Sequence, residues 1–386
     1  MLLRLDAQRL RAAAVPAEWD EWVTLNRAGL RIAGDKTAET EIFLPLDADT
    51  IRVATDLGEL LNELRRVGCS PEVNPWGISS LLHHGLVRLP RTEYEGVYLL
   101  AMGDQAQITW EGDGPQLDWA VDYPWISARS RQDRRPDTQV LLDLLAGATE
   151  RKLREAGGEG VLMLSSGKDS SAVALAIAEA GFRDVPTVTF ASGSDDAEPP
   201  MAGAVADSLG LKHHTVELPT ATEDVAAALT AFFRRSPRAC ADLSQIPYAL
   251  VAATFDMDGA VFDGGGNDSY MGLLPSRRDV HKDRLRIRGR RSAQLVARWT
   301  PVHSPFNYLT RSRAGAALAA RTLRFHESRR LFPAAIDTHD SLWTEDDGHD
   351  LIDLYGLYRE RHGDTAGSML KQRLAARSVG MSAALP

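Results

Sequence analysis

A short run of hydroxyl, glycine and acidic residues carries the clearest chemistry in this chain of 386 residues. Ser165, Ser166 and Gly167 follow the apolar run 161–164 and precede an apolar pattern of helical spacing that begins near residue 172. Hydroxyls donate hydrogen bonds, glycine lets the backbone approach an anion closely, and the free amides of a helix N-terminus attract negative charge. A strand, a loop and a helix in this order predict a phosphate-binding site.

Asp169 lies among these donors and carries the wrong charge for a phosphate ligand. Magnesium is usually held by one or two carboxylates together with nucleotide phosphate oxygens. We therefore expect Asp169 to bind magnesium. The spacing excludes a Walker A loop, because Lys168 precedes an aspartate and the first glycine of that motif is missing.

The segments that follow this first loop, residues 165–170, predict the elements that position it. Residues 185–191 read as a second buried strand, a helix starts at the two prolines 199–200 and ends at Gly210, and residues 213–218 form a third strand. Strands that alternate with helices through short loops predict a doubly wound parallel sheet, in which ligands bind beyond the carboxyl ends of the strands.

A fourth apolar strand, residues 260–262, leads into a second glycine-rich loop, residues 263–272. Three consecutive glycines, 264–266, at a strand end indicate a close approach of the backbone to another group. If this strand end neighbours the first loop, Asp268 is placed to be the second carboxylate of the magnesium site.

The first loop, S-S-G-K-D-S, resembles the S-G-G-x-D-S pyrophosphate-binding loop of the ATP pyrophosphatase (PP-loop) family, with Ser166 in the place of the first glycine. The order and separation of the two loops resemble the synthetase domain of asparagine synthetases, beta-lactam synthetases and lasso-peptide cyclases over about residues 141–272. The resemblance implies a fold similar to the adenine nucleotide alpha-hydrolases. It also implies cleavage of ATP between its alpha and beta phosphates.

The resemblance also implies roles for particular residues. It predicts that one set holds pyrophosphate: Ser165, Ser166, Gly167, Lys168, Asp169 and Ser170. It places Asp169 and Asp268 on magnesium, Phe190 and Gly264 in the adenosine pocket, and Lys371 at the transition state. A surface lysine on a helix is the alternative for Lys371, and a structural role is the alternative for His213 and His214, which match a family histidine.

Gly265 is the main departure from the family pattern, because asparagine synthetases carry a glutamate there and beta-lactam synthetases a tyrosine. A glycine side chain cannot accept a proton from the attacking amine. Asp263 is a candidate for the missing base. A nucleophile of low pKa would need no base, and a protein that binds nucleotide without ligation is the third possibility.

The N-terminal part indicates a second domain. In the family a glutaminase domain uses a cysteine at residue two, but here that residue is Leu2, and the two cysteines are Cys69 and Cys240. Residues 78–110 resemble the closing part of that domain. We therefore predict a shortened, inactive glutaminase (Ntn)-like α+β domain over 1–126, a polar linker over 127–136 and the synthetase domain over 137–386. An unrelated small α/β domain is the alternative for the first part.

Composition narrows the class of protein. The net charge of −9 argues against nucleic-acid binding, and two cysteines offer no disulfide framework, which favours the cytoplasm. No apolar stretch is long enough to span a membrane, and no signal peptide is recognised. The basic segment 277–291 is either a solvated surface or a segment that closes over pyrophosphate or meets an acidic partner.

These observations predict a cytoplasmic, ATP- and magnesium-dependent ligase. It would adenylate a small carboxylate and join it to an amine-type nucleophile that does not come from glutamine, in the synthesis of a specialised metabolite such as an antibiotic. A carrier protein or peptide substrate and a homodimer are left open. The alternatives are a non-catalytic nucleotide-binding subunit, or a sulfur-transferring or RNA-modifying PP-loop enzyme. The last type commonly needs reactive cysteines or a basic RNA surface, and the sequence shows neither.

Overall fold

The computed structural model divides into two compact units. Unit 1 comprises Met1–Arg131, Arg238–Ala241 and Leu273–Gly367, and unit 2 comprises Gln132–Pro237, Asp242–Gly272 and Ser368–Pro386. The predicted linker, 127–136, lies outside the described residues. The structure describes residues 1–6, 15–26, 29–35, 40–45, 50–85, 87, 89–100, 103–111, 114–121, 137–191, 193, 195–217, 222–235, 238, 249–250, 259–265, 278, 281, 292, 295–296, 299, 323, 325–338 and 382–384.

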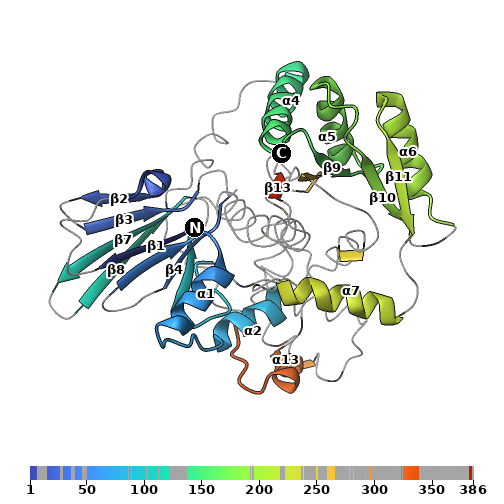
Figure 1. The fold of residues 1–386 in the computed structure, drawn as a ribbon. Helices are drawn as coiled ribbons and strands as arrows, with labels where there is room; N and C mark the ends of the chain where they lie inside the picture. The colour runs from blue at the N-terminus through green and yellow to red at the C-terminus, as the bar shows by residue number, and fades with distance from the viewer. Residues whose placement is uncertain are drawn as a thin grey trace. The chain divides into compact units, whose positions relative to one another are not determined.

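Unit 1 contains two antiparallel four-stranded sheets (Figure 1). The first has the order β1-β5-β4-β6, with β1 at Leu2–Asp6, β5 at Thr50–Ala54, β4 at Ile42–Pro45 and β6 at Val97–Leu100. The second has the order β2-β3-β7-β8, with β2 at Val23–Asn26, β3 at Gly29–Ala33, β7 at Asp104–Glu111 and β8 at Gly114–Val121. One buried cluster takes side chains from both sheets, among them Leu3, Ile42, Leu30 and Ile108. The sheets therefore pack against each other around a shared core.

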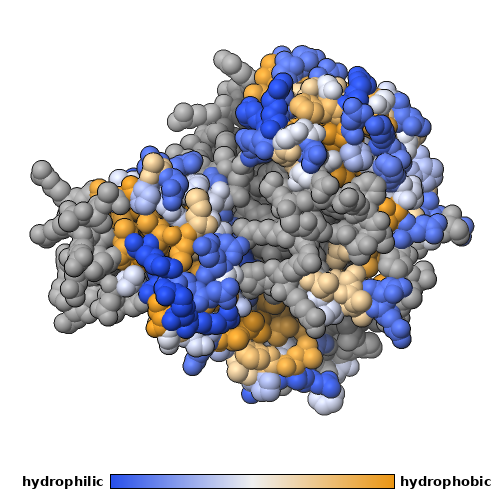
Figure 2. Space-filling model, in the orientation of Figure 1, coloured by the Kyte–Doolittle hydropathy of each residue, from blue (hydrophilic) through white to orange (hydrophobic). Residues whose placement is uncertain are grey.

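Helix α1, Leu57–Arg66, covers the other face of the first sheet. Its leucines, Leu57, Leu60, Leu61 and Leu64, are buried with Phe43 of β4, because alternate residues of a strand point to opposite faces. The Asp56 side chain accepts a hydrogen bond from the Glu59 backbone N–H at 2.8 Å and so caps the helix. The outer surface over α1 is hydrophilic, as Figure 2 shows. A short 3-10 helix, Ala17–Trp19, precedes β2.

A late segment of the chain packs on helix α2, Pro75–His84. Helix α13, Phe325–Leu331, lies against α2, and both ring nitrogens of buried His83 meet hydroxyls. His83 Nδ1 is 2.8 Å from Thr338 Oγ1 and Nε2 is 2.8 Å from Ser328 Oγ. A buried polar side chain is tolerated when its hydrogen-bonding groups are satisfied, as they are here. Through these two contacts His83 links α2 to residues about 250 positions later in the chain.

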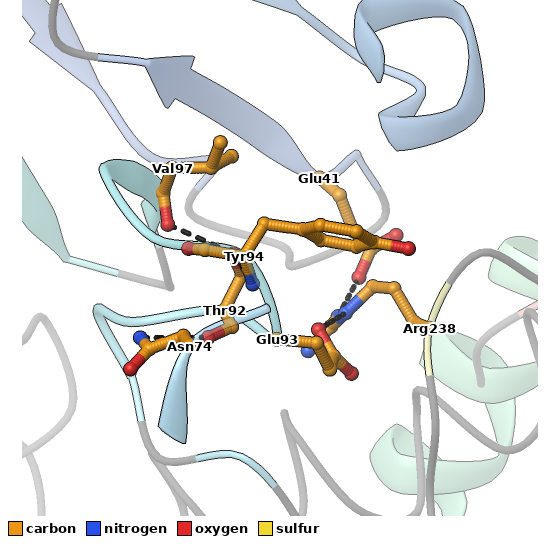
Figure 3. Close-up of polar contacts among 7 residues, drawn as sticks. All are labelled: Glu41, Asn74, Thr92, Glu93, Tyr94, Val97 and Arg238. Atoms are coloured by element: carbon orange, nitrogen blue, oxygen red, sulfur yellow. Dashed lines mark hydrogen bonds and ion pairs between the residues drawn. The ribbon is translucent and has the colours of Figure 1, made fainter. Parts of the chain in front are cut away.

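Arg238 enters the interior of unit 1, where it meets two acidic side chains (Figure 3). Its Nη1 contacts Glu41 Oε1, and its Nε lies 3.8 Å from Glu93 Oε2. All three side chains are almost fully buried. Beside them the Thr92 hydroxyl donates to the Val97 carbonyl at 2.9 Å and Asn74 Nδ2 donates to the Thr92 carbonyl at 3.2 Å.

Unit 2 has a mixed α/β fold built on a parallel sheet of order β11-β10-β9-β12-β13. The strands are β9 at Gly160–Met163, β10 at Thr187–Ala191, β11 at His213–Glu217, β12 at Ala260–Asp263 and β13 at Ser382–Ala384. From β9 the chain extends the sheet in one direction through β10 and β11, and β12 pairs with the other side of β9. The carboxyl ends of the neighbouring strands β9 and β12 therefore form a topological switch point, where ligands of parallel sheets bind.

Among the described residues of unit 2, the helices are α4 at Thr138–Glu155, α5 at Lys168–Glu179, α6 at Glu198–Leu209 and α7 at Thr222–Arg235. Helices α4 and α6 both contact α5, so these three form one layer, whose core includes Leu153, Ile177 and Phe262 (Figure 1). Val161 and Val261 point to the opposite face and are buried too. The second helical layer of a doubly wound sheet stays a prediction. No helix among the described residues is long and apolar enough to span a membrane.

Candidate functional site

A cavity of about 320 Å³ opens at the carboxyl ends of β9, β10 and β12. Its volume lies at the lower end of the range of small-molecule sites. The wall consists of strand ends and the two predicted loops: Met163, Leu164, Ser165, Gly167, Asp169, Ser170, Val188, Phe190, Asp263, Gly264 and Gly265. The parallel register explains the convergence, because Met163 pairs with both Val188 and Asp263.

The first loop is held by hydrogen bonds between its own residues. The Ser165 N–H donates to Ser170 Oγ at 3.0 Å, and the two serine hydroxyl oxygens are 2.7 Å apart. The Gly167 N–H donates to Ser165 Oγ at 3.2 Å. Helix α5 then begins after Gly167, and among the described residues no side chain caps it there. The amides of the first helical turn are thus suited to an anion in the cavity.

Gly264 lies directly against the start of α5. A Cβ atom placed on it would be 2.4 Å from the Ser170 backbone nitrogen and 2.8 Å from the Asp169 carbonyl carbon. Real side chains do not approach a backbone so closely, so only glycine fits at this position. The close approach predicted for the second loop is therefore present, and the group it approaches is the backbone of the first loop.

Two aspartates contribute carboxylates to the cavity wall. Asp169 Oδ1 pairs with Lys168 Nζ at 2.7 Å, and about a third of the Asp169 side chain is exposed. Asp263 Oδ1 accepts a hydrogen bond from the Gly265 N–H at 2.6 Å, which orients this carboxylate at the end of β12. Among the described residues no group of three metal-ligating side chains occurs. A single carboxylate is nevertheless compatible with magnesium when phosphate oxygens complete the coordination.

Ser166 faces a different partner. Its hydroxyl donates to Glu198 Oε2 at 3.0 Å and its backbone N–H donates to Glu198 Oε1. Glu198 is the first residue of α6. It was not among the predicted site residues, because an acidic residue in the first turn of a helix is common and does not indicate which residue it contacts.

The cavity brings together most of the predicted site residues that the structure describes. Seven of them line it: Ser165, Gly167, Asp169, Ser170, Phe190, Asp263 and Gly264. Of the described residues, Ser166 and Lys168 belong to the loop but not to the lining set. Asp268 and Lys371 lie outside the described residues, as does most of 277–291. His213 packs elsewhere, with Nδ1 at 2.9 Å from Thr187 Oγ1.

A parallel sheet with a serine- and glycine-rich loop at its switch point is typical of nucleotide-binding α/β proteins. The family model described as asparagine synthase matches residues 140–372, which is more than half of the chain. The chain therefore belongs to the asparagine synthase family. This confirms the family expected from the two loops.

Among solved structures, the chain is similar to an NH3-dependent NAD synthetase from Campylobacter jejuni subsp. jejuni NCTC 11168 in complex with the nitrate ion. The two are 21% identical over 36% of this chain and 63% of that one, with a TM-score of 0.26. The alignment thus spans less than two thirds of the synthetase. No protein of curated function matches significantly.

Proposed function

We propose that this protein is an ATP-dependent carbon–nitrogen ligase that activates a carboxylate as its adenylate and transfers the acyl group to an amine. The observation that carries the proposal is the cavity whose wall combines the first loop, the start of α5 and the glycine-rich end of β12. Membership of the asparagine synthase family supports it.

The geometry suggests how the nucleotide binds. Ser165, Gly167 and Ser170 would hold pyrophosphate together with the first amides of α5. Phe190 would contact the adenosine. Asp169, with Asp268 of the second loop, would hold magnesium, which supplies neutralising charge for the phosphates. Lys371 would approach the transition state from the C-terminal part of the chain.

Two displacements make up the proposed reaction. A carboxylate oxygen of the substrate attacks the alpha phosphorus, the bond from this phosphorus to the bridging oxygen breaks, and pyrophosphate leaves with the electron pair. The amine then attacks the acyl carbon, AMP leaves, and the amine loses a proton. We propose that Asp263, which lines the cavity, receives that proton, because Gly265 has no side chain that could accept it.

We propose a preformed amine as the nucleophile rather than ammonia from glutamine. The resemblance to the family places its cysteine nucleophile at residue 2, and Leu2 has no thiol. We propose a specialised metabolite as the product and a small carboxylate, free or on a carrier protein or peptide, as the acyl donor. Gly265 also supports a second candidate, a subunit that binds nucleotide without turnover.

The experiment measures AMP and pyrophosphate from MgATP with a panel of carboxylates, with and without hydroxylamine as the trapping nucleophile. We expect a hydroxamate with one class of carboxylate, and we expect its loss in Asp169→Asn. Glu179→Gln, an exposed change at the far end of α5, is the matched control. Tight ATP binding without AMP for any carboxylate would favour the binding subunit, and absence of both would contradict the proposal.

A further inference from the structure

Glu198 receives both polar hydrogens of Ser166. One carboxylate oxygen accepts the backbone N–H and the other accepts the hydroxyl at 3.0 Å. Glu198 is itself fixed, because its backbone N–H donates to Asp196 Oδ1 at 3.0 Å and Pro199 behind it is buried. The pair joins the loop after β9 to the first residue of α6.

This arrangement changes the role of Ser166. The residues on either side of it, Ser165 and Gly167, line the cavity, but Ser166 directs its donors to the carboxylate instead. Hydrogen bonds to an ionised acceptor are roughly twice as strong as neutral ones. The negative charge of Glu198 also lies in the first turn of α6, where the helix dipole favours it. The two hydrogen bonds between Ser166 and Glu198 therefore fix the first loop to a residue outside the loop.

The pair also explains a departure in the sequence. Where the PP-loop pattern has a glycine, this chain has Ser166, and the extra hydroxyl supplies the second bond to Glu198. A glycine there would keep only the backbone N–H bond. Serine at this position thus adds a hydrogen bond to Glu198, while the Ser166 side chain is not part of the cavity lining.

We infer that Glu198 is a positioning residue that acts through Ser166 to hold the first loop in its polyphosphate-binding conformation. The inference rests on the proposed function. It makes the two hydrogen bonds that Glu198 accepts from Ser166 the property that matters, and this distinguishes Glu198 from a carboxylate that binds metal or opposes the incoming phosphates.

Three variants separate these roles by calorimetric titration with MgATP. We expect Glu198→Ala to weaken binding about tenfold, because both hydrogen bonds from Ser166 to the carboxylate are lost. Glu198→Gln should stay within about threefold of wild type, since its amide oxygen can accept the N–H while its NH2 group donates to the Ser166 oxygen. Ser166→Gly should have an intermediate effect. This effect should shrink in the Glu198→Ala background, because the partner is already gone.

Amide hydrogen exchange of Ser166, followed by NMR without ligand, tests the attachment independently of nucleotide. It should be at least about tenfold faster in Glu198→Ala and near wild type in Glu198→Gln. Glu179→Ala should change neither measurement. Unchanged exchange in Glu198→Ala, tighter MgATP binding in that variant, or equal damage by Gln and Ala would overturn the inference. If wild type binds no MgATP, the proposed function fails, and the exchange rates still decide whether the attachment exists.

Discussion

At the scale of single residues, Gly264 is the position where the site tolerates least change. We expect Gly264→Ala to abolish MgATP binding and to destabilise unit 2 by about 1–3 kcal/mol, because the added methyl group overlaps the backbone of α5. Denaturant unfolding and titration with MgATP measure the two effects. The control is Gly193→Ala, where no described atom lies within 4 Å of the added carbon. Normal nucleotide binding by Gly264→Ala would show that the two loops need not touch.

His213 provides a residue-scale prediction of pH dependence. Burial lowers the pKa of His213 below its ordinary value of 6.5, the neighbouring His214 adds to this, and Asp207 opposes it. The unfolded chain therefore binds a proton first as the pH falls through about 6.5, and the folded state loses stability there. We expect the free energy of unfolding to decrease from pH 7.5 to 5.5, and His213→Gln to reduce this slope. An identical slope in the variant would contradict the prediction.

The sequence was informative about residues whose chemistry is local. That Ser165, Asp169 and Gly264 lie around one cavity could be predicted, because loops that follow neighbouring parallel strands meet at the same edge of the sheet. Glu198 could not be predicted in the same way. Its partner lies 32 positions earlier, and an isolated glutamate at a helix start usually has only a capping role.

At the scale of elements, the buried side chain of Arg238 contacts Glu41 and Glu93, which come from much earlier parts of the chain in unit 1. We expect Arg238→Met to destabilise the protein by about 3–5 kcal/mol, because Glu41 and Glu93 would remain buried beside each other without the guanidinium. Denaturant titration measures this loss. Arg154→Met removes an exposed pair with Glu150 on α4 and should change stability by less than about 1 kcal/mol. Equal effects would show that the Arg238 contacts are not important for stability.

The alternation of strand and helix in unit 2 was predictable over a continuous stretch. The strand at 185–191 is observed as Thr187–Ala191, the strand at 213–218 as His213–Glu217, and the helix between them ends at Gly210, which has a left-handed φ of 68°. Hydrophobic periodicity and the residues that start or end a helix act over a few neighbouring positions, so the sequence alone indicates these elements. Strand β13 carries no such signal, because its three small residues, S-A-A, depend on pairing with β12.

At the scale of the whole molecule, the two units differ in what nucleotide should do to them. The cavity belongs to unit 2, so saturating MgATP should protect the amides of β9 and α5 from hydrogen exchange and leave those of β1 and β5 unchanged. At a ligand concentration of one hundred times Kd, the protection limit is about a hundredfold. Mass spectrometry of peptic fragments measures it. Equal protection of both units would contradict a site confined to unit 2.

The two units are not separated at a single position along the chain. Arg238–Ala241 and Leu273–Gly367 join unit 1 although they come after β11, and only contacts such as those of His83 and Arg238 place them there. In the sequence these residues are an ordinary histidine and arginine. Their partners depend on the three-dimensional packing, which composition and periodicity do not encode.

The pairing of β9 with β12 has a consequence for synthesis of the protein. Val161 pairs with Val261, so one wall of the cavity is made 100 residues after the other. Contacts of such sequence separation form late, because a long intervening segment must first be ordered or closed as a loop. On the ribosome, β9, α5 and β10 can associate while β12 is still unmade. The nascent chain therefore contains the first loop before the residues of β12 that face it across the cavity have been synthesised. Nucleotide can bind in the complete cavity, and so stabilise the fold, only after Gly265 has left the ribosome.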